Sequence, residues 1–162
     1  MYLLDTNVFI SAYQFHYGFD FHPGFWEWLI QAKNDGRVFS IKKVHDEISR
    51  HEDPLSEWAG YHKDTLFLAP PSDIELSLKQ IPDYLYETYA SSDVRDFLGK
   101  ADYYLIAYAL SNQFTVVTHE VHKPTKAKIK IPKVCQNFKV ECITPFEMLR
   151  QENARFVLDP VG

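Results

Sequence analysis

The stretch that decides the fold is Met1-Tyr2-Leu3-Leu4-Asp5-Thr6-Asn7-Val8-Phe9. Its short apolar run is typical of a central strand that is covered on both faces of a sheet. The run ends at Asp5, and ligands of open α/β sheets bind beyond the carboxyl ends of the strands. Two interpretations follow. Asp5 is either a site residue or only the cap of the helix that begins at Val8, a helix that Thr6 or Asn7 could also cap.

Composition limits the class of protein. The chain has 162 residues, of which 46% are hydrophobic and 15% aromatic. These values suit one folded domain over residues 1–162 and exclude a disordered chain. No apolar run approaches the ~20 residues of a membrane span, and Asp5 interrupts the first apolar run too early for a secretory signal. We therefore expect a cytoplasmic protein without membrane contact. Cys135 and Cys142 lack a CxxC spacing and are predicted to be core thiols.

Short strand-like runs alternate with helical patterns along the chain. We predict strands near residues 2–4, 38–41, 114–118 and 138–143, with a brief extended piece at 66–68. One of the helical patterns starts near Ile74 and is expected to stop at Gln80, because Pro82 follows. The alternation predicts an α/β fold, namely a three-layer α/β/α sandwich with a central parallel sheet.

Residues 13–24 are rich in aromatic side chains and are broken by glycine and proline, which predicts an ordered loop. The rings have two possible uses. They could stack on nucleic-acid bases, where each stacked base contributes ~1–3 kcal/mol, or they could pack underneath the loop. Packing is the interpretation that the pattern favours.

Four acidic residues fall where a parallel sheet would bring them together. Asp5 follows the first strand, Glu47 lies in the helix after the second, Asp102 opens a buried helix and Glu120 ends the strand after it. The helix dipole alone also favours a carboxylate such as Asp102 in a first helical turn. Four acids in one cleft would repel each other strongly unless a cation neutralised them. Carboxylate ligands suit Mg²⁺ or Mn²⁺ better than Zn²⁺.

The net charge of −5 is unevenly distributed. Residues 1–122 hold nine Lys/Arg and eighteen Asp/Glu, whereas residues 123–162 hold eight and four. The basic side chains are concentrated in one segment, which includes Lys123, Lys126, Lys128 and Lys130. Such a segment is either a solvated loop or a surface that faces a polyanion. Taken alone, the segment favours the solvated loop.

At the four acidic positions the sequence resembles the PIN domain, the nuclease fold of toxin ribonucleases in bacterial toxin–antitoxin pairs. The motifs are Leu3-Leu4-Asp5-Thr6-Asn7-Val8, Val44-His45-Asp46-Glu47-Ile48, Ala101-Asp102-Tyr103-Tyr104-Leu105-Ile106-Ala107 and Val116-Val117-Thr118-His119-Glu120. Each motif alone is weak, but the four occur in the family's order over nearly the whole chain. The aromatic loop 17–28 and the segment 129–135 look similar to a less-studied PIN-like subgroup of bacterial and archaeal proteins.

The resemblance implies a metal-dependent endoribonuclease that hydrolyses RNA phosphodiester bonds. Carried over position by position, it makes Asp5, Glu47, Asp102 and Glu120 the catalytic acids, with Asp5, Asp102 and Glu120 as ligands of Mg²⁺ or Mn²⁺ and Asn7 and Thr118 as polar supports. The chain departs from the family at the fourth position, where PIN nucleases usually carry Asp and this sequence has Glu120.

The resemblance also implies partners. They are an RNA substrate, a cognate antitoxin protein of a type II toxin–antitoxin pair, and a second copy of the chain in a homodimer. In this interpretation Lys123, Lys126, Lys128 and Lys130 hold the RNA backbone. His119 could assist proton transfer, although a single histidine at a strand end is more often structural.

Two other functions deserve comparison. A phosphatase of the haloacid-dehalogenase type also places Asp after its first strand, but a second acid usually follows two residues later, where this chain has Asn7. No glycine-rich phosphate loop follows any predicted strand, which argues against a nucleotide-binding fold. The remaining alternative is a PIN-like module that binds RNA or a partner protein and has lost its activity, and Glu120 is its best support.

Overall fold

The sheet is built from five short strands, all parallel to their neighbours. The computed structural model describes residues 1–72, 74–121 and 128–157. The strands are β1 (Tyr2–Leu4), β2 (Val38–Ile41), β3 (Phe67–Leu68), β4 (Thr115–Val117) and β5 (Cys142–Ile143). Their order in the sheet is β3-β2-β1-β4-β5. The first strand in the sequence is thus the central strand, with Tyr2 paired to Val38 of β2 and to Thr115 of β4.

Helices fill the connections between the strands. The elements are α1 (Thr6–Ser11), the π-helix η1 (Ala12–His16), α2 (Pro23–Asn34), α3 (Lys42–Ile48), α4 (Pro54–Tyr61), α5 (Glu75–Thr88), α6 (Ser91–Leu98), α7 (Ala101–Asn112), α8 (Ile131–Phe138) and α9 (Pro145–Gln151). None of the helices in the described ranges has both the length and the apolarity that crossing a membrane demands.

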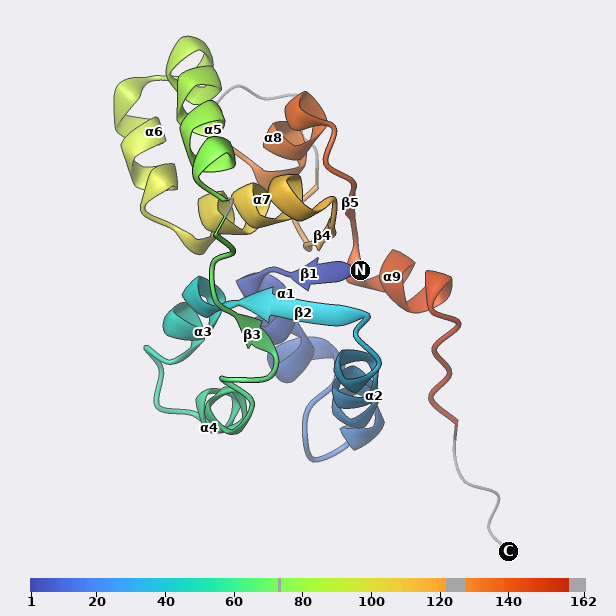
Figure 1. Cartoon of the computed structure of the whole chain (residues 1–162). Coiled ribbons are helices and arrows are strands. Elements are labelled where there is room, and N and C mark those ends of the chain that lie inside the picture. The colour runs from blue at the N-terminus through green and yellow to red at the C-terminus, as the bar shows by residue number, and fades with distance from the viewer. Residues whose placement is uncertain (73, 122–127, 158–162) are drawn as a thin grey trace, which may run out of the picture.

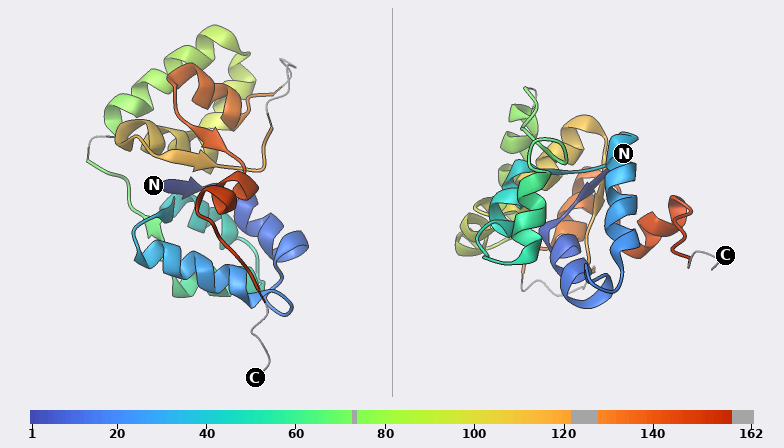
Figure 2. Two further views of the ribbon diagram at one scale, coloured as in Figure 1. Left: turned by 90° about the vertical axis from the view of Figure 1, so that its right-hand side faces the viewer. Right: turned by 90° about the horizontal axis from the view of Figure 1, so that it is seen from below.

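The path of the chain determines which helices cover which side of the sheet. It steps outward from β1 to β2 and β3, and then returns past β1 to β4 and β5. Right-handed crossovers in the two directions place their helices on opposite faces. In Figures 1 and 2, α1–α4 lie beside the half of the sheet that contains β2 and β3, and α5–α8 lie beside the half that contains β4 and β5. The predicted three-layer α/β/α sandwich with a central parallel sheet is confirmed.

The core explains why β1 decides the fold. Leu3 and Leu4 are fully buried, as are Val116 and Val117 on β4 and Ile106 on α7. Because both faces of the central strands are covered, these strands are continuous apolar runs with no polar alternation. The strands near 2–4 and 38–41 and the extended piece at 66–68 lie where they were predicted, and the strand expected at 114–118 is limited to Thr115–Val117.

The strand predicted at 138–143 is mostly wrong. Phe138 is the last residue of α8, Lys139 takes a left-handed backbone conformation with φ of 55°, and only Cys142–Ile143 pairs with β4. The alternation of apolar and polar residues that suggested a strand is explained by a helix end followed by a turn. Cys135 lies buried on α8 and Cys142 is half-buried, so the prediction of two core thiols holds fully for Cys135 only.

Pro82 does not interrupt its helix, contrary to the sequence prediction. Helix α5 continues through Pro82 from Glu75 to Thr88. A proline inside a helix leaves the carbonyl four residues earlier without its usual donor, and here that carbonyl belongs to Leu78. The hydroxyl of Tyr103 on α7 donates to the Leu78 oxygen at 2.6 Å and replaces the missing bond.

The aromatic segment mostly packs inward, as the sequence favoured. Its first part continues α1 as the π-helix η1, and its last residues begin α2 at Pro23. The ring of Tyr17 stacks on that of Phe25 with centroids 4.3 Å apart, and Phe19 lies 4.4 Å from Trp26. Phe15 and Phe21 are the exceptions, because 71% and 66% of their surfaces are exposed.

Candidate acidic site at the carboxyl edge of the sheet

Thr118 is the centre of a polar network at the carboxyl ends of β1 and β4. Its Oγ1 donates a hydrogen bond to Asp5 Oδ2 at 2.8 Å and accepts one from Asn7 Nδ2 at 3.0 Å. The backbone N–H of Glu120 donates to Thr118 Oγ1 at 3.1 Å, and that of His119 donates to Asn7 Oδ1 at 3.0 Å. Asn7 and Thr118, the two predicted supports, therefore connect the end of β1 to the end of β4.

Asp5 is buried among other acids. It occupies the N-cap position of α1, but its side chain makes no capping hydrogen bond there, and neither Thr6 nor Asn7 is the cap. Burial raises the pKa of Asp5 to about 8, and the charges of Asp102 and Glu120 add to the increase, against the lowering effect of the hydrogen bond from Thr118. A capping role alone does not account for a carboxyl group held in this environment.

Asp102 faces the same acids from the first turn of α7. Its pKa is raised to about 6, first by burial and then by the charges of Glu120 and Glu47, while Lys100 lowers it. A helix N-terminus alone would favour the ionised carboxylate. Burial and the charges of Glu120 and Glu47 act against that ionised form, so the dipole does not by itself explain why an acid stands here.

Glu47 joins three helices. Its Oε2 accepts a hydrogen bond from Thr6 Oγ1 at 2.6 Å, and its Oε1 accepts one from the backbone N–H of Ala101 at 2.9 Å. Glu47 thus connects α3 to the first residues of α1 and α7. Because Ala101 immediately precedes Asp102, this contact also holds the backbone that carries the Asp102 side chain.

Glu120 holds the start of α8. Its Oε1 accepts a hydrogen bond from Lys130 Nζ at 2.5 Å, and its Oε2 accepts one from the backbone N–H of Ile131 at 2.8 Å. The negative charge of Glu120 nevertheless acts on both Asp5 and Asp102. The longer side chain at this position therefore reaches the segment before α8 and remains close to the other acids.

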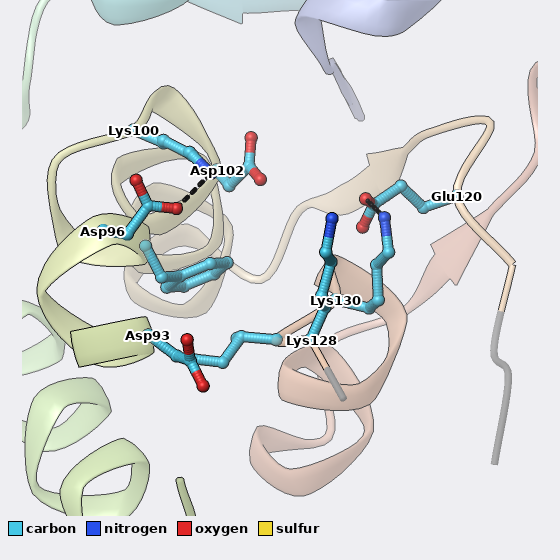
Figure 3. A pocket seen from close by; sticks show the side chains of 9 residues that line it. Asp93, Asp96, Lys100, Asp102, Glu120, Lys128 and Lys130 are labelled. Carbon is cyan, nitrogen blue, oxygen red and sulfur yellow. Dashed lines mark hydrogen bonds and ion pairs between the residues drawn. The ribbon is translucent and has the colours of Figure 1, made fainter. Parts of the chain in front are cut away.

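A pocket of about 240 Å³ opens beside these acids. Figure 3 shows Asp102 on one side of the pocket and Glu120, Lys128 and Lys130 on the other. The predicted RNA-binding residues Lys128 and Lys130 therefore line the same pocket as two of the predicted acids. The other two predicted lysines, Lys123 and Lys126, lie outside the described residues.

The pocket also contains residues that sequence reasoning missed. Asp93 and Asp96 of α6 line it together with Lys100. Lys100 Nζ donates to Asp96 Oδ2 at 2.6 Å, as Figure 3 shows. The i,i+4 spacing of Asp96 and Lys100 was a visible signal for an ion pair, whereas nothing in the sequence indicated that α6 would turn this pair toward Asp102.

His119 belongs to an aromatic cluster. Its ring centroid lies 5.5 Å from that of His16 and 5.7 Å from that of Phe146. Burial, followed by the charge of His16, lowers the pKa of His119. The side chain thus has a packing role at the end of β4, in agreement with the structural interpretation of a lone histidine there.

The acids do not form a closed set of ligands in this conformation. Within the described ranges, no three His, Cys, Asp or Glu side chains are grouped as a metal centre would need.

Comparison with known proteins identifies the family of the chain. A family model described as a domain of unknown function, DUF4411, matches residues 2–156. The chain belongs to the DUF4411 family. No curated protein and no solved structure matches it.

The chemistry available to this DUF4411 protein follows from its charges. At the carboxyl edge of the sheet the charges of Asp102 and Glu120 raise the pKa of Asp5, and the charge of Glu120 raises that of Asp102. Acids that raise the affinity of a neighbour for protons would also attract a cation. Lys128 and Lys130 add positive charge at the other wall of the pocket. Acids and lysine side chains that face one pocket are a chemistry that suits a phosphate ester, whose oxygens the lysines would bind.

Proposed function

We propose that this DUF4411 protein is a metal-dependent endoribonuclease of the PIN type. The observation that supports it is the convergence of Asp5, Asp102 and Glu120 from separate elements on the carboxyl edge of the sheet, where burial and the neighbouring acids raise the pKa of Asp5 and of Asp102. Burying repelling carboxylates costs stability, so a site built this way suggests a cation as its normal occupant.

The residues present fit Mg²⁺ or Mn²⁺. The donors are carboxylate oxygens, which these hard cations prefer. Asp5, Asp102 and Glu120 would hold the ion, and Glu120 has lone pairs left besides the two that Lys130 and Ile131 engage. A bound ion would supply Lewis-acid polarisation of a phosphoryl oxygen and would lower the pKa of an attacking water.

The protein's own residues would provide positioning. Thr118 Oγ1 holds Asp5 Oδ2, and Glu47 holds the N–H of Ala101, so the Asp5 carboxylate and the backbone beside Asp102 are in place before substrate arrives. The ammonium groups of Lys128 and Lys130 would bind non-bridging oxygens of the RNA backbone. Such fixed groups stabilise charge that develops on a phosphate without reorganising during the reaction.

Cleavage of RNA by the purified protein tests the proposal. We expect hydrolysis with Mg²⁺ or Mn²⁺, none in EDTA, and a loss of about 10²-fold or more in Asp5→Asn, because a metal contributes several kcal/mol to the transition state. The neutral amide suits the buried Asp5 position, so this variant should fold. Asp83→Asn, which alters an exposed acid of α5, is the matched control and should keep full activity.

Cleavage that continues equally in EDTA and in Asp5→Asn would refute the mechanism. The alternative, a module that binds RNA or a partner without cleaving, is favoured by one observation: Lys130 and Ile131 already engage both oxygens of Glu120. Absence of cleavage across single-stranded and structured RNAs, with RNA binding retained, would favour that alternative.

We also propose that this nuclease is the toxin of a type II toxin–antitoxin pair that acts in the cytoplasm as a homodimer. The support is the PIN-like order of the four acidic motifs. Expression of the chain alone should arrest growth, Asp5→Asn should not, and co-expression of the protein encoded by the neighbouring gene should relieve the arrest. Growth that is unaffected by the wild-type chain would contradict the toxin assignment and would leave the hydrolytic activity to be judged by its own assay.

A further inference from the structure

A second pocket lies at the carboxyl ends of β2 and β3, the same edge of the sheet that carries the acidic site. Its volume is about 230 Å³. Its apolar lining includes Ile41 and Leu68, the last residues of the two strands, with Pro70, Ile74 and Tyr104. We call it the tyrosine pocket. The acidic site does not use any of these side chains.

The rim of the tyrosine pocket carries two cations and one acid, and its aromatic ring is held in place. Lys42 and Lys43, from the first turn of α3, line the pocket together with Asp46 of the same helix. Lys43 Nζ lies 4.8 Å from the centroid of the Tyr104 ring, as in a cation–π contact. The ring of Tyr103 lies 4.8 Å from the same ring. Neighbours on both α3 and α7 thus restrict Tyr104.

The same two helices connect this pocket to the acidic site. On α3, Lys43 and Glu47 are four positions apart, which places them on one face about 5–6 Å from each other. On α7, Tyr104 is the second residue after Asp102. Residues two positions apart point to different sides of a helix, so a nucleic-acid strand bound at both sites would pass around the start of α7.

We propose that the tyrosine pocket binds one base of a single-stranded RNA, next to the phosphate held at the acidic site. This inference rests on the proposed function. The pocket is smaller than the ~300–1,000 Å³ of drug-sized sites, and a flat ring system suits its apolar walls. Only an unpaired base can enter such a pocket and stack on an aromatic side chain, so the substrate class is single-stranded RNA.

An apolar side chain of a protein partner is the competing occupant. The charges favour the nucleotide, because Lys42 and Lys43 outnumber the single acid Asp46 at the rim and complement the phosphates on either side of a bound base. The pocket also lies at the edge of the sheet that carries Asp5 and Asp102, which favours the nucleotide as well.

Binding measured in EDTA separates this inference from catalysis. A short oligoadenylate is compared with an oligomer of the same length in which every residue is abasic. We expect the wild-type protein to bind the oligoadenylate at least about fivefold more tightly, which is the lower limit for one stacked base. Tyr104→Leu should remove most of this difference in affinity without weakening the binding of the abasic oligomer. Tyr86→Leu, at an exposed tyrosine of α5, is the matched control.

A second measurement does not depend on any variant. Oligoadenylate that carries 2-aminopurine should lose fluorescence on binding to the wild-type protein, because the base stacks on a tyrosine ring. Equal affinity for the two oligomers without quenching would overturn the proposal, as would a folded Tyr104→Leu variant that keeps the full preference. RNA that binds with this preference and is never cleaved would refute the hydrolytic function and leave the base site standing.

Discussion

At the scale of single residues, Asp5 is the position where the proposed function conflicts with the stability of the fold. The folded protein raises the pKa of Asp5 from 3.8 to about 8, chiefly by burial. The folded state therefore holds a proton that the unfolded chain releases near pH 4. The associated stability is fully present below that pH and is lost as pH rises toward 8.

We accordingly expect the metal-free protein to lose stability between pH 5 and pH 8, by about 1 kcal/mol per pH unit. Asp5→Asn should flatten this dependence and raise Tm at pH 8, because the amide carries no charge. Asp83→Asn is the matched control and should follow the wild type. Thermal unfolding in EDTA at several pH values measures the effect, and equal slopes for wild type and Asp5→Asn would contradict it.

At the scale of elements, α5 depends on its neighbour α7. The Tyr103 hydroxyl supplies the donor that Pro82 withholds from the Leu78 carbonyl. Tyr103→Phe should cost about 1–3 kcal/mol, the penalty for leaving a partly buried carbonyl unsatisfied. Tyr86→Phe, at an exposed tyrosine of α5, should cost almost nothing. Chemical denaturation measures both values.

Restoring the missing backbone donor provides a further check. In a Pro82→Ala background the N–H of residue 82 can bond to Leu78, so Tyr103→Phe should become less costly there. An equal cost in both backgrounds would show that the Tyr103 hydroxyl does not compensate for the proline.

The helices and strands also show which parts of the fold the sequence could predict. The apolar run at β1 and the β-branched run at β4 predicted the central strands, because burial on both faces leaves an unambiguous pattern. The sequence did not distinguish the end of helix α8 from the short strand β5. The helix end, the turn at Lys139 and the strand together produce the alternation of apolar and polar residues that is typical of one strand. The continuity of α5 could not be predicted, because the group that replaces the proline's missing donor comes from a distant helix.

The candidate site also has parts that the sequence could predict and parts that it could not. The ends of the predicted strands indicated where Asp5 and Glu120 would lie, because a parallel topology alone brings those positions to one edge of the sheet. The hydrogen bonds from Lys130 and Ile131 to Glu120, and the acids that α6 contributes, depend on side-chain direction and helix packing, which a single sequence does not encode in any local pattern.

At the scale of the whole molecule, charge is separated across the pocket. Lys128 and Lys130 stand opposite Asp102 in a protein whose net charge is −5. RNA affinity should therefore depend strongly on these two lysines. Lys128→Gln combined with Lys130→Gln should weaken binding in EDTA and reduce the slope of log K against log[salt] by about 1.4, at ~0.7 per phosphate contact with a single strand.

The double variant Lys63→Gln and Lys79→Gln removes the same charge from exposed positions elsewhere and serves as the control. If both pairs lower the salt dependence equally, the two lysines of the pocket act through net charge alone and do not contact the RNA backbone.

The central place of β1 also affects how the chain is made. The ribosome produces Tyr2 113 residues before its partner Thr115 on β4. At ~5–20 residues per second, the interval is roughly 6–23 s. During that time Leu3 and Leu4 lack the strand that completes their burial. Such a high contact order predicts slow folding, and the nascent first strand is a natural substrate for chaperones that shield apolar segments.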